Sequence, residues 1–441
     1  MINRTYQSNI TRKQIFLLSI PVFFSNLAIP FVGIVDTGLM GNLGDAKYLA
    51  ATSIATSVMT MIIWSFGFLR MGTVGIVAQL YAKSDYREIA RTIIRNFLLA
   101  ILLSLILILF QNIIIKLTGI FFITSTDTQE LIKTYISVRV LSIPAEFIIY
   151  ILIGFYFGIQ KTKISSLFII VLSSLNIIFS SFFVLSLSLN VFGVALGTLI
   201  SSYITVILFS FFTYKFIVKN FQITPSFQKL FIISKIVRLL SINFDIFVRT
   251  LFLTFAFLWI TFLGSKLGED YVAVNSILIQ FIFISAFFLD AYAFSTEGIV
   301  GYAIGRRNLK SFLLTVKNSI QLSICTALLI SILYLIFFKQ IINILTDIEI
   351  LRFISYNHAI WIIVIPPIAA LCYQFDGIFI GASQTKDLRN GMMISVASFV
   401  VISIYLTKYF NNHGLWLSLL LFMILRSLTL NIFFKKILRK F

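Results

Sequence analysis

The sequence predicts an all-α membrane protein with twelve transmembrane helices, arranged in two six-helix lobes that are related by a parallel internal repeat. Of the 441 residues, 59% are hydrophobic and only 12% are charged, whereas soluble domains carry roughly 25% charged and 45–50% apolar residues. A soluble fold could not bury this much apolar surface. Twelve apolar runs can cross a bilayer, and the two halves of the chain match each other at a fixed spacing.

The twelve runs follow one another along the whole chain. A helix that crosses a bilayer needs about 20 apolar residues. The runs are continuous, whereas the strands of a membrane barrel would alternate over segments of about ten residues, so helices are expected. The runs cover residues 14–40, 49–80, 94–117, 133–158, 164–187, 192–217, 236–263, 272–303, 314–338, 354–380, 390–409 and 413–434.

An internal repeat relates the two halves. Thr73 and Thr296 lie 223 residues apart, and the same spacing joins matching residues in four spans. Because each repeat holds six spans, both repeats enter the membrane from the same side, which makes the repeat parallel and predicts a cavity between two lobes that rock in alternating access. We expect an N-terminal lobe over 1–217, a basic linker over 218–235 and a C-terminal lobe over 236–441. Further matches are Pro144 with Pro367, Gly154 with Gly377 and Gly158 with Gly381.

The Lys and Arg residues indicate the orientation in the membrane. Of these 35 residues, 24 fall in the termini and loops of one side, 7 fall on the other side, and the remaining four lie inside spans. Because cytoplasmic loops carry the excess of positive charge, we expect both termini in the cytoplasm and the chain in the cytoplasmic (inner) membrane. The net charge of +19 is divided among these short clusters, so nucleic acid is not expected as a partner.

Several kinds of site are missing from the sequence. Cys325 and Cys372 both lie in apolar runs and make neither a disulfide framework nor a metal cluster. The N-terminus lacks a short apolar segment with a small-residue cleavage site, so no signal peptide is expected. Motifs of zinc proteases, serine hydrolases and nucleotide-binding proteins are absent. We expect no enzyme activity, metal or cofactor, and any pumping must be driven by an ion gradient.

Asp36 is the first candidate for a functional residue. It lies in the last third of an apolar run that extends from Ile15 to Met40. A charged side chain at such a position costs about 2.5–3.5 kcal/mol on insertion scales and marks a functional site by default. No basic residue stands three or four positions away. A carboxylate in a dry cavity can gain and lose a proton near neutral pH, which is the chemistry that a proton-coupled carrier requires.

Other charges lie in the spans or at their ends. Asp290 and Glu297 are seven residues apart and share one helix face. Asp245 and Arg249 are four apart and can pair on one face, although such a pair is more often structural than functional. Glu146 follows a proline and is interpreted as a helix-end feature. Two further residues are Asp376 in the tenth span and Arg70 in the second, which could balance Asp36 or an acid of the other lobe.

Specific segments resemble the multidrug and toxic compound extrusion (MATE) family, and within it the DinF-like branch. The resemblance covers nearly the whole chain. The segments that carry it are Asp36-Thr37 with Gly41-x-Leu43-Gly44, Phe68-Leu69-Arg70-Met71-Gly72-Thr73, Asn243-x-Asp245 with Arg249-Thr250, Leu289-Asp290 with Ala293-Phe294 and Glu297, Gly305-Arg306, and Asp376-Gly377 with Gly381.

The resemblance implies a two-lobed antiporter that expels amphipathic, often cationic small molecules in exchange for protons or sodium ions. In similar proteins the first-helix Asp, here Asp36, binds the coupling ion. A proline lets that helix bend, and Pro21 and Pro30 are the candidates here. Arg70 and Met71 of the second span are assigned to the substrate cavity. We expect a monomer in the bilayer.

The fifth span departs from the family pattern. The family often carries an Asn there, followed four residues later by an Asp. This chain keeps Asn176 but has Ser180 in place of the Asp. The first-lobe carboxylate pair is therefore expected to be reduced to Asp36 alone. Should this lobe not couple to an ion, the second-lobe residues Asp245, Arg249, Asp290, Glu297 and Asp376 remain as the polar network that does.

Two alternatives belong beside the antiporter. A flippase for a lipid-linked headgroup, from the same wider superfamily, would need a larger and more basic cavity, for which Arg70, Arg249 and Arg426 are slight support. A membrane-embedded enzyme that modifies lipids would need clustered polar residues on its loops. The loops between the apolar runs are short and lack such clusters.

Overall fold

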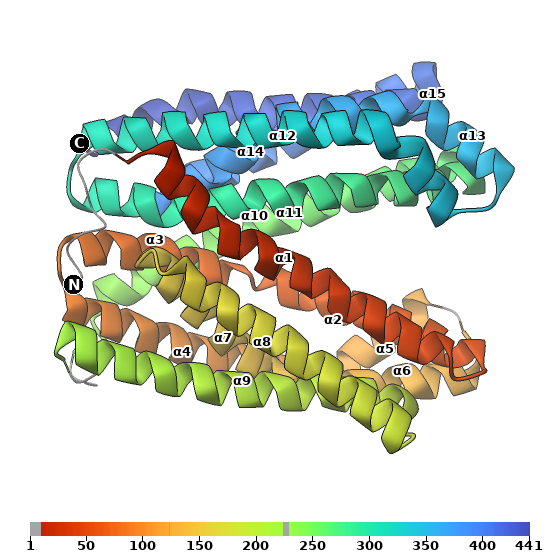
Figure 1. Ribbon diagram of the computed structural model, residues 1–441, viewed down its shortest axis with the longest axis horizontal. Helices are drawn as coiled ribbons and strands as arrows, with labels where there is room; N and C mark the ends of the chain where they lie inside the picture. Colours follow the sequence, from red (N-terminus) through yellow and green to blue (C-terminus); the bar gives the residue numbers. More distant parts are fainter. Residues whose placement is uncertain (1–9, 123, 224–228) are drawn as a thin grey trace. The chain divides into compact units, whose positions relative to one another are not determined.

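The computed structural model describes residues 10–122, 124–223 and 229–441, and nearly all of them are helical. Residues 1–9 of the predicted N-terminal lobe and 224–228 of the predicted linker lie outside the described residues. Figure 1 shows the order of the elements. They are α1 (Arg12–Gly41), α2 (Ala46–Ser65), α3 (Phe68–Ala82), α4 (Tyr86–Leu109), α5 (Gln111–Phe121), α6 (Thr126–Arg139), η1 (Val140–Ser142), α7 (Ile143–Gly158), α8 (Thr162–Ser181), η2 (Phe182–Ser186), α9 (Asn190–Phe221), α10 (Ile233–Leu267), α11 (Glu269–Gly305), α12 (Leu309–Leu345), α13 (Glu349–Asn357), α14 (Ala359–Gly381) and α15 (Thr385–Leu438).

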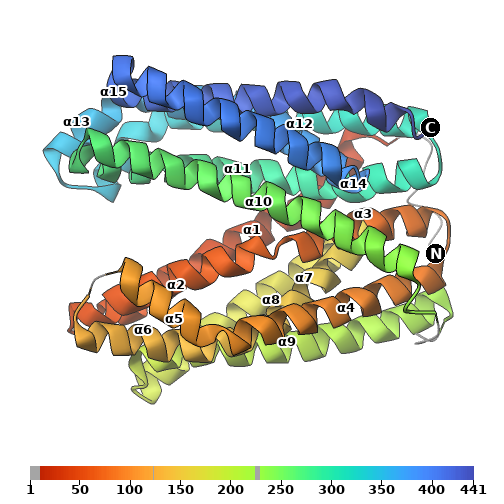
Figure 2. The same ribbon diagram turned by 180° about the vertical axis from the view of Figure 1, so that it is seen from behind.

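Within the described part of the chain, eleven helical segments are long and apolar enough to cross a membrane. The last of them, α15, has 54 residues and would be about 80 Å long at 1.5 Å per residue. The hydrocarbon core of a bilayer is only about 30 Å thick. The helix breaks at Asn411, and Figure 2 shows α15 as two long segments that meet at a bend. Since α15 holds two spans, the predicted all-helical protein with twelve spans is confirmed.

The break in α15 has a local cause. Asn411 has a φ of 49° and a ψ of −134°, and asparagine accepts positive φ more readily than most residues. Gly414 follows, where a Cβ atom would lie only 2.0 Å from the carbonyl oxygen of Leu406. Beside the break, Asn412 exchanges two hydrogen bonds, of 2.8 and 3.0 Å, with Asn275 of α11. These contacts fix where the eleventh span ends and the twelfth begins.

The chain forms two compact units. The N-terminal unit is Phe24–Leu240, and the C-terminal unit is Ser241–Phe441 together with the described residues up to Phe23. The first turns of α1 therefore pack with the helices of the C-terminal unit. There Ile15 shares an apolar cluster with Tyr292 and Ile299 of α11. The rest of α1, which carries Asp36, belongs to the N-terminal unit.

The internal repeat is visible in the packing within each unit. In the N-terminal unit a Cβ atom on Gly154 of α7 would lie 2.5 Å from the carbonyl oxygen of Arg70 of α3. In the C-terminal unit a Cβ atom on Gly377 of α14 would lie 2.6 Å from that of Ala293 of α11. Both members of each contact are 223 residues apart between the units. Glycine allows helix backbones to approach closely inside a membrane, so the same close contact positions α7 and α14, the helices that carry Glu146 and Asp376.

Candidate functional site: a charged cavity in the N-terminal unit

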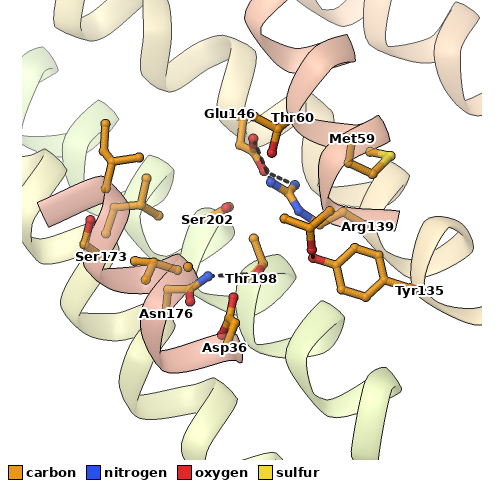
Figure 3. Close-up of a pocket in the computed structure, with 15 residues that line it drawn as sticks. Asp36, Met59, Thr60, Tyr135, Arg139, Glu146, Ser173, Asn176, Thr198 and Ser202 are labelled. Atoms are coloured by element: carbon orange, nitrogen blue, oxygen red, sulfur yellow. Dashed lines mark hydrogen bonds and ion pairs between the residues drawn. The ribbon is translucent and has the colours of Figure 1, made fainter. Parts of the chain in front are cut away.

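The N-terminal unit contains a cavity of about 250 Å³ beside Asp36. It lies among α1, α2, α6, α7, α8 and α9, and Figure 3 shows the polar side chains that point toward it. Its charged lining residues, among those the structure describes, are Asp36, Arg139 and Glu146. Polar uncharged lining residues include Tyr135, Ser173, Asn176, Thr198 and Ser202.

Two of these charges are positioned by a break in the fourth span. Helix α6 ends at Arg139, the three residues of η1 follow, and α7 then begins at Ile143 with Pro144 in its first turn. Proline fits a first turn because its missing N–H group has no partner there in any case. Arg139 thus lies at a helix C-terminus and Glu146 at a helix N-terminus, where the helix dipoles favour a cation and an anion respectively.

Arg139 and Glu146 form a two-pronged ion pair across this break. Nη1 of Arg139 contacts Oε1 of Glu146, and Nη2 lies 3.3 Å from Oε2. The hydroxyl of Ser142 in η1 accepts from the Arg139 guanidinium and donates to Oε1 at 2.8 Å. The side chains of the pair are only 14% and 12% exposed. Paired, charge-assisted hydrogen bonds of this geometry are among the strong ones in proteins.

Asp36 is held differently from Glu146. It is 8% exposed, and among the described residues it makes no ion pair. Its carboxylate is hydrogen-bonded by the side chain of Ser180 and interacts electrostatically with Arg139. The Oδ1 atom is buried without any hydrogen-bond partner. A buried carboxylate oxygen without a partner is costly, and a proton, a cation or a cationic substrate group in the cavity would satisfy it.

The side chains of α8 and α9 complete the polar wall around Asp36. The amide of Asn176 donates to the Thr198 hydroxyl at 2.8 Å, and the Ser180 hydroxyl lies 3.5 Å from the Asn176 oxygen. Helix α9 lies directly against Ser180 because residue 197 is a glycine, whose Cβ atom would be 2.5 Å from the serine oxygen. The predicted group Asp36, Asn176 and Ser180 is thus brought together.

Arg70 is not the cation beside Asp36. It lies on α3, buried, with its guanidinium 5.8 Å from the centre of the Phe157 ring. Neither Arg70 nor the adjacent Met71 lines the described cavity. Arg139 takes the place that the sequence analysis offered to Arg70. The expectation that Asp36 is the sole carboxylate of this site is also corrected, because Glu146 is both a helix-end residue and a lining residue of the same cavity.

In the C-terminal unit, the predicted pair between Asp245 and Arg249 is wrong. Asp245 of α10 instead accepts from Arg389 at 2.7 Å and from Thr385 at 2.9 Å, both on α15. Their positions on one helix face made the pair possible, but both side chains find partners on other helices. Interhelical partners therefore outcompete the local pairing.

A buried cluster surrounds Asp376 in the same unit. Arg249 of α10 and Arg426 of α15 both donate to Oδ2 of Asp376 on α14, the second at 2.8 Å. All three residues are at least 94% buried, with exposed fractions of 6%, 3% and 6%. Asp290 of α11 interacts electrostatically with Arg426. Glu297, 1% exposed, lies further along α11, where its backbone meets Gly381 of α14.

The two prolines of the first span do not interrupt it. Helix α1 runs as one element from Arg12 to Gly41 and contains both Pro21 and Pro30. A proline inside a helix removes one backbone hydrogen bond and weakens the helix locally. Pro30 lies one and a half turns before Asp36. The bending role of both residues stays a prediction.

The family of the chain follows from comparison with known proteins. A family model described as MatE matches residues 21–182 and 246–408, one stretch in each half of the chain. The chain belongs to the MATE family of transporters. This MATE protein is 32% identical to DNA damage-inducible protein F of Escherichia coli (strain K12), over 95% of this chain and 91% of that protein, which agrees with the DinF-like branch.

Two further likenesses support the family and the fold. The multidrug resistance protein NorM of Vibrio cholerae is 26% identical over 75% of this chain and 73% of that protein. A crystal structure of the Vibrio cholerae MATE transporter VcmN in its bent form matches with a TM-score of 0.84 at 18% identity, and covers 97% of both chains. This MATE protein is therefore a multi-pass secondary transporter of the multidrug-efflux type and not an enzyme. MATE transporters bind small-molecule substrates and coupling ions.

The sequence analysis of this MATE transporter did not identify Arg139, Glu146 and Tyr135 as lining residues of the site. A signal for two of them was present, because an arginine and a glutamate stand seven residues apart on either side of Pro144 in an otherwise apolar run. Opposite charges around a proline inside a span indicate a broken helix with polar ends facing inward. Tyr135 carried no such signal. Its hydroxyl accepts from Thr56 of α2 at 3.0 Å.

Proposed function

We propose that this MATE transporter exports amphipathic, cationic small molecules in exchange for protons or sodium ions by alternating access, and that Asp36 is the coupling carboxylate. The observation that carries the proposal is the buried Asp36 oxygen without a partner at the wall of a polar cavity. The family membership and the multidrug names of relatives such as NorM agree with it.

The charges of the cavity support competition between ion and substrate. With all three groups ionised, Asp36, Arg139 and Glu146 carry a net charge of −1. A cationic substrate neutralises that charge, and so does a proton or a sodium ion on Asp36. Because one negative charge cannot hold both cations equally well in a site of low dielectric constant, arrival of the coupling ion favours release of the drug. A neutral site then favours the return of the empty carrier.

The position of Asp36 fits a supply of ions from outside the cell. The excess of Lys and Arg places both termini in the cytoplasm under the positive-inside rule, so α1 enters from that side and Asp36 lies toward its outer end. We infer the same orientation, in the cytoplasmic membrane, for the whole carrier. Exchange of one proton for one monovalent drug is electroneutral, and a pH difference of one unit then supplies about 1.4 kcal/mol, roughly tenfold accumulation.

Efflux of a cationic dye from proteoliposomes under an imposed gradient tests the proposal. We expect the wild type to move dye under a proton gradient or a sodium gradient, and Asp36→Asn to lose at least about tenfold of that rate. Asp45→Asn is the matched control. It removes a carboxylate from the exposed N-cap of α2, where hydrogen bonds from Lys47 keep the Asp45 pKa below its usual value. Undiminished gradient-driven efflux by Asp36→Asn would overturn the proposal.

A further inference from the structure

The cavity in the N-terminal unit has one cation and two carboxylates along its wall. Arg139 contacts Glu146 through both of its terminal nitrogens. It also interacts electrostatically with Asp36, which lines the same cavity. Figure 3 shows the Arg139–Glu146 pair on one side of the cavity and Asp36 on the other. One arginine side chain therefore has two carboxylates to choose between.

Several contacts bias Arg139 toward Glu146. Ser142 bridges the pair, and η1 keeps Arg139 and Glu146 at the facing ends of α6 and α7. The N-terminus of α7 favours a negative charge on Glu146, which keeps the partner of Arg139 ionised. Asp36 receives no comparable bond from Arg139, and its Oδ1 atom stays without a partner.

We propose that Glu146 is a positioning residue that holds Arg139 away from Asp36 and so leaves Asp36 free to exchange one monovalent cation per cycle. This inference rests on the proposed function of Asp36. Without Glu146, the remaining carboxylate of the cavity would attract the Arg139 guanidinium, because a buried guanidinium without a counter-ion is strongly unfavourable. A guanidinium bound to Asp36 is a permanent internal cation that neither a coupling ion nor a drug displaces.

The pair also sets the charge of the site. With Arg139 present, the cavity can bind one net positive charge before it becomes neutral. Removal of Arg139 leaves Asp36 and Glu146 as two exchangeable carboxylates around the same cavity. The site would then accept two protons or one dication. Arg139 therefore restricts the carrier to monovalent exchange, and the Arg139–Glu146 pair acts in place of the carboxylate that Ser180 replaces.

The first test compares Glu146→Gln with the double variant Arg139→Gln/Glu146→Gln in the dye-efflux assay. We expect Glu146→Gln to lose at least about tenfold in rate at neutral pH and to require a more acidic external pH for efflux. We expect the double variant to recover to within about threefold of the wild type, because no arginine then competes for Asp36. Glu146→Asp, which keeps the charge, should retain most of the activity. Glu130→Gln, an exposed acid on α6, is the matched control.

Three results would overturn this inference without touching the proposed function. In the first, Glu146→Gln transports at the wild-type rate while Asp36→Asn does not. In the second, the double variant is as inactive as Glu146→Gln although both elute as folded protein, which is the outcome of a purely structural ion pair. In the third, which stays measurable if Glu146→Gln fails to fold, Arg139→Gln keeps the wild-type number of coupling ions per dye molecule. We expect that number to rise by one.

Discussion

The two units of the transporter use buried charge in opposite ways. In the N-terminal unit one arginine serves two carboxylates beside a cavity, and an oxygen of Asp36 is left without a partner. In the C-terminal unit two arginines serve one carboxylate, since Arg249 and Arg426 both bind Oδ2 of Asp376. A carboxylate held by two guanidiniums has little affinity left for a cation. We infer that the N-terminal unit carries the exchange chemistry and that the cluster around Asp376 stabilises the fold.

The helical scaffold beneath these charges is nevertheless the same. Gly154 and Gly377 make equivalent close contacts 223 residues apart, but the charges do not repeat at that spacing. The residues 223 positions after Arg139 and Glu146 are Ile362 and Ala369, and the residue 223 positions before Asp376 is Ile153. A duplicated scaffold thus carries two unrelated polar sites, which lets one unit exchange ions while the other stays constant.

The largest effect on stability is expected from Asp376→Asn. The change leaves two buried guanidiniums without their carboxylate, and loss of one partner of a buried pair costs about 3–5 kcal/mol. Thermal unfolding of the purified protein in detergent should show a lower melting temperature. Asp347→Asn is the control, because the Asp347 side chain is fully exposed in its ion pair with Arg352 and such pairs contribute about 0–1 kcal/mol. Equal melting temperatures for the two variants would refute the structural role of Asp376.

Alanine at the repeated glycines tests the shared scaffold. In both Gly154→Ala and Gly377→Ala the new Cβ atom would lie within 2.6 Å of a backbone carbonyl oxygen on the facing helix. Overpacking of this kind costs about 1–3 kcal/mol, and we expect similar losses of unfolding free energy in the two units. Gly119→Ala has no atom within 4 Å of its Cβ and should stabilise α5 slightly. A loss in only one unit would break the equivalence of the two contacts.

The smallest effect concerns acid. The C-terminal unit holds both histidines of the chain, and their rings stack with centroids 4.1 Å apart. Burial lowers the pKa of His358 below its usual value, and the neighbouring His413 adds to the effect. The folded state therefore favours the neutral ring. The stability that this group contributes is complete above about pH 6.5 and is lost as the pH falls below that value.

Unfolding measured at several pH values checks this expectation. Between pH 7 and pH 5.5 the wild type should lose up to about 1 kcal/mol more stability than His358→Asn, which cannot take up the proton. Parallel losses in the two proteins would mean that His358 does not respond to acid in the folded state.

The features that could be predicted from the sequence are those set by hydropathy and local pattern. The spans follow from continuous apolar runs, the repeat from a constant spacing, and Asp36 from the cost of a charge in an apolar helix. The glycines that join α3 to α7 and α11 to α14 were visible as matched residues, although their contacts were not.

The partners of the buried charges could not be predicted, because they are set by tertiary packing. The rule for residues four apart favoured Asp245 with Arg249, but Asp245 binds Arg389, which is 144 residues away. The position of Glu146 near a proline was read correctly as a helix end. Its pairing with Arg139 depends on the three-residue break of η1, and the length and shape of that break are decided by packing rather than by propensity.

The central claim is that Asp36 gives up its ion when the substrate binds. The most direct measurement is proton release from the purified transporter in sodium-free, weakly buffered detergent solution, followed with a pH indicator as a cationic dye is added. The account predicts release of about one proton per bound dye by the wild type at saturation, and none by Asp36→Asn, while Asp45→Asn releases as much as the wild type. Equal release by Asp36→Asn and the wild type would contradict the account.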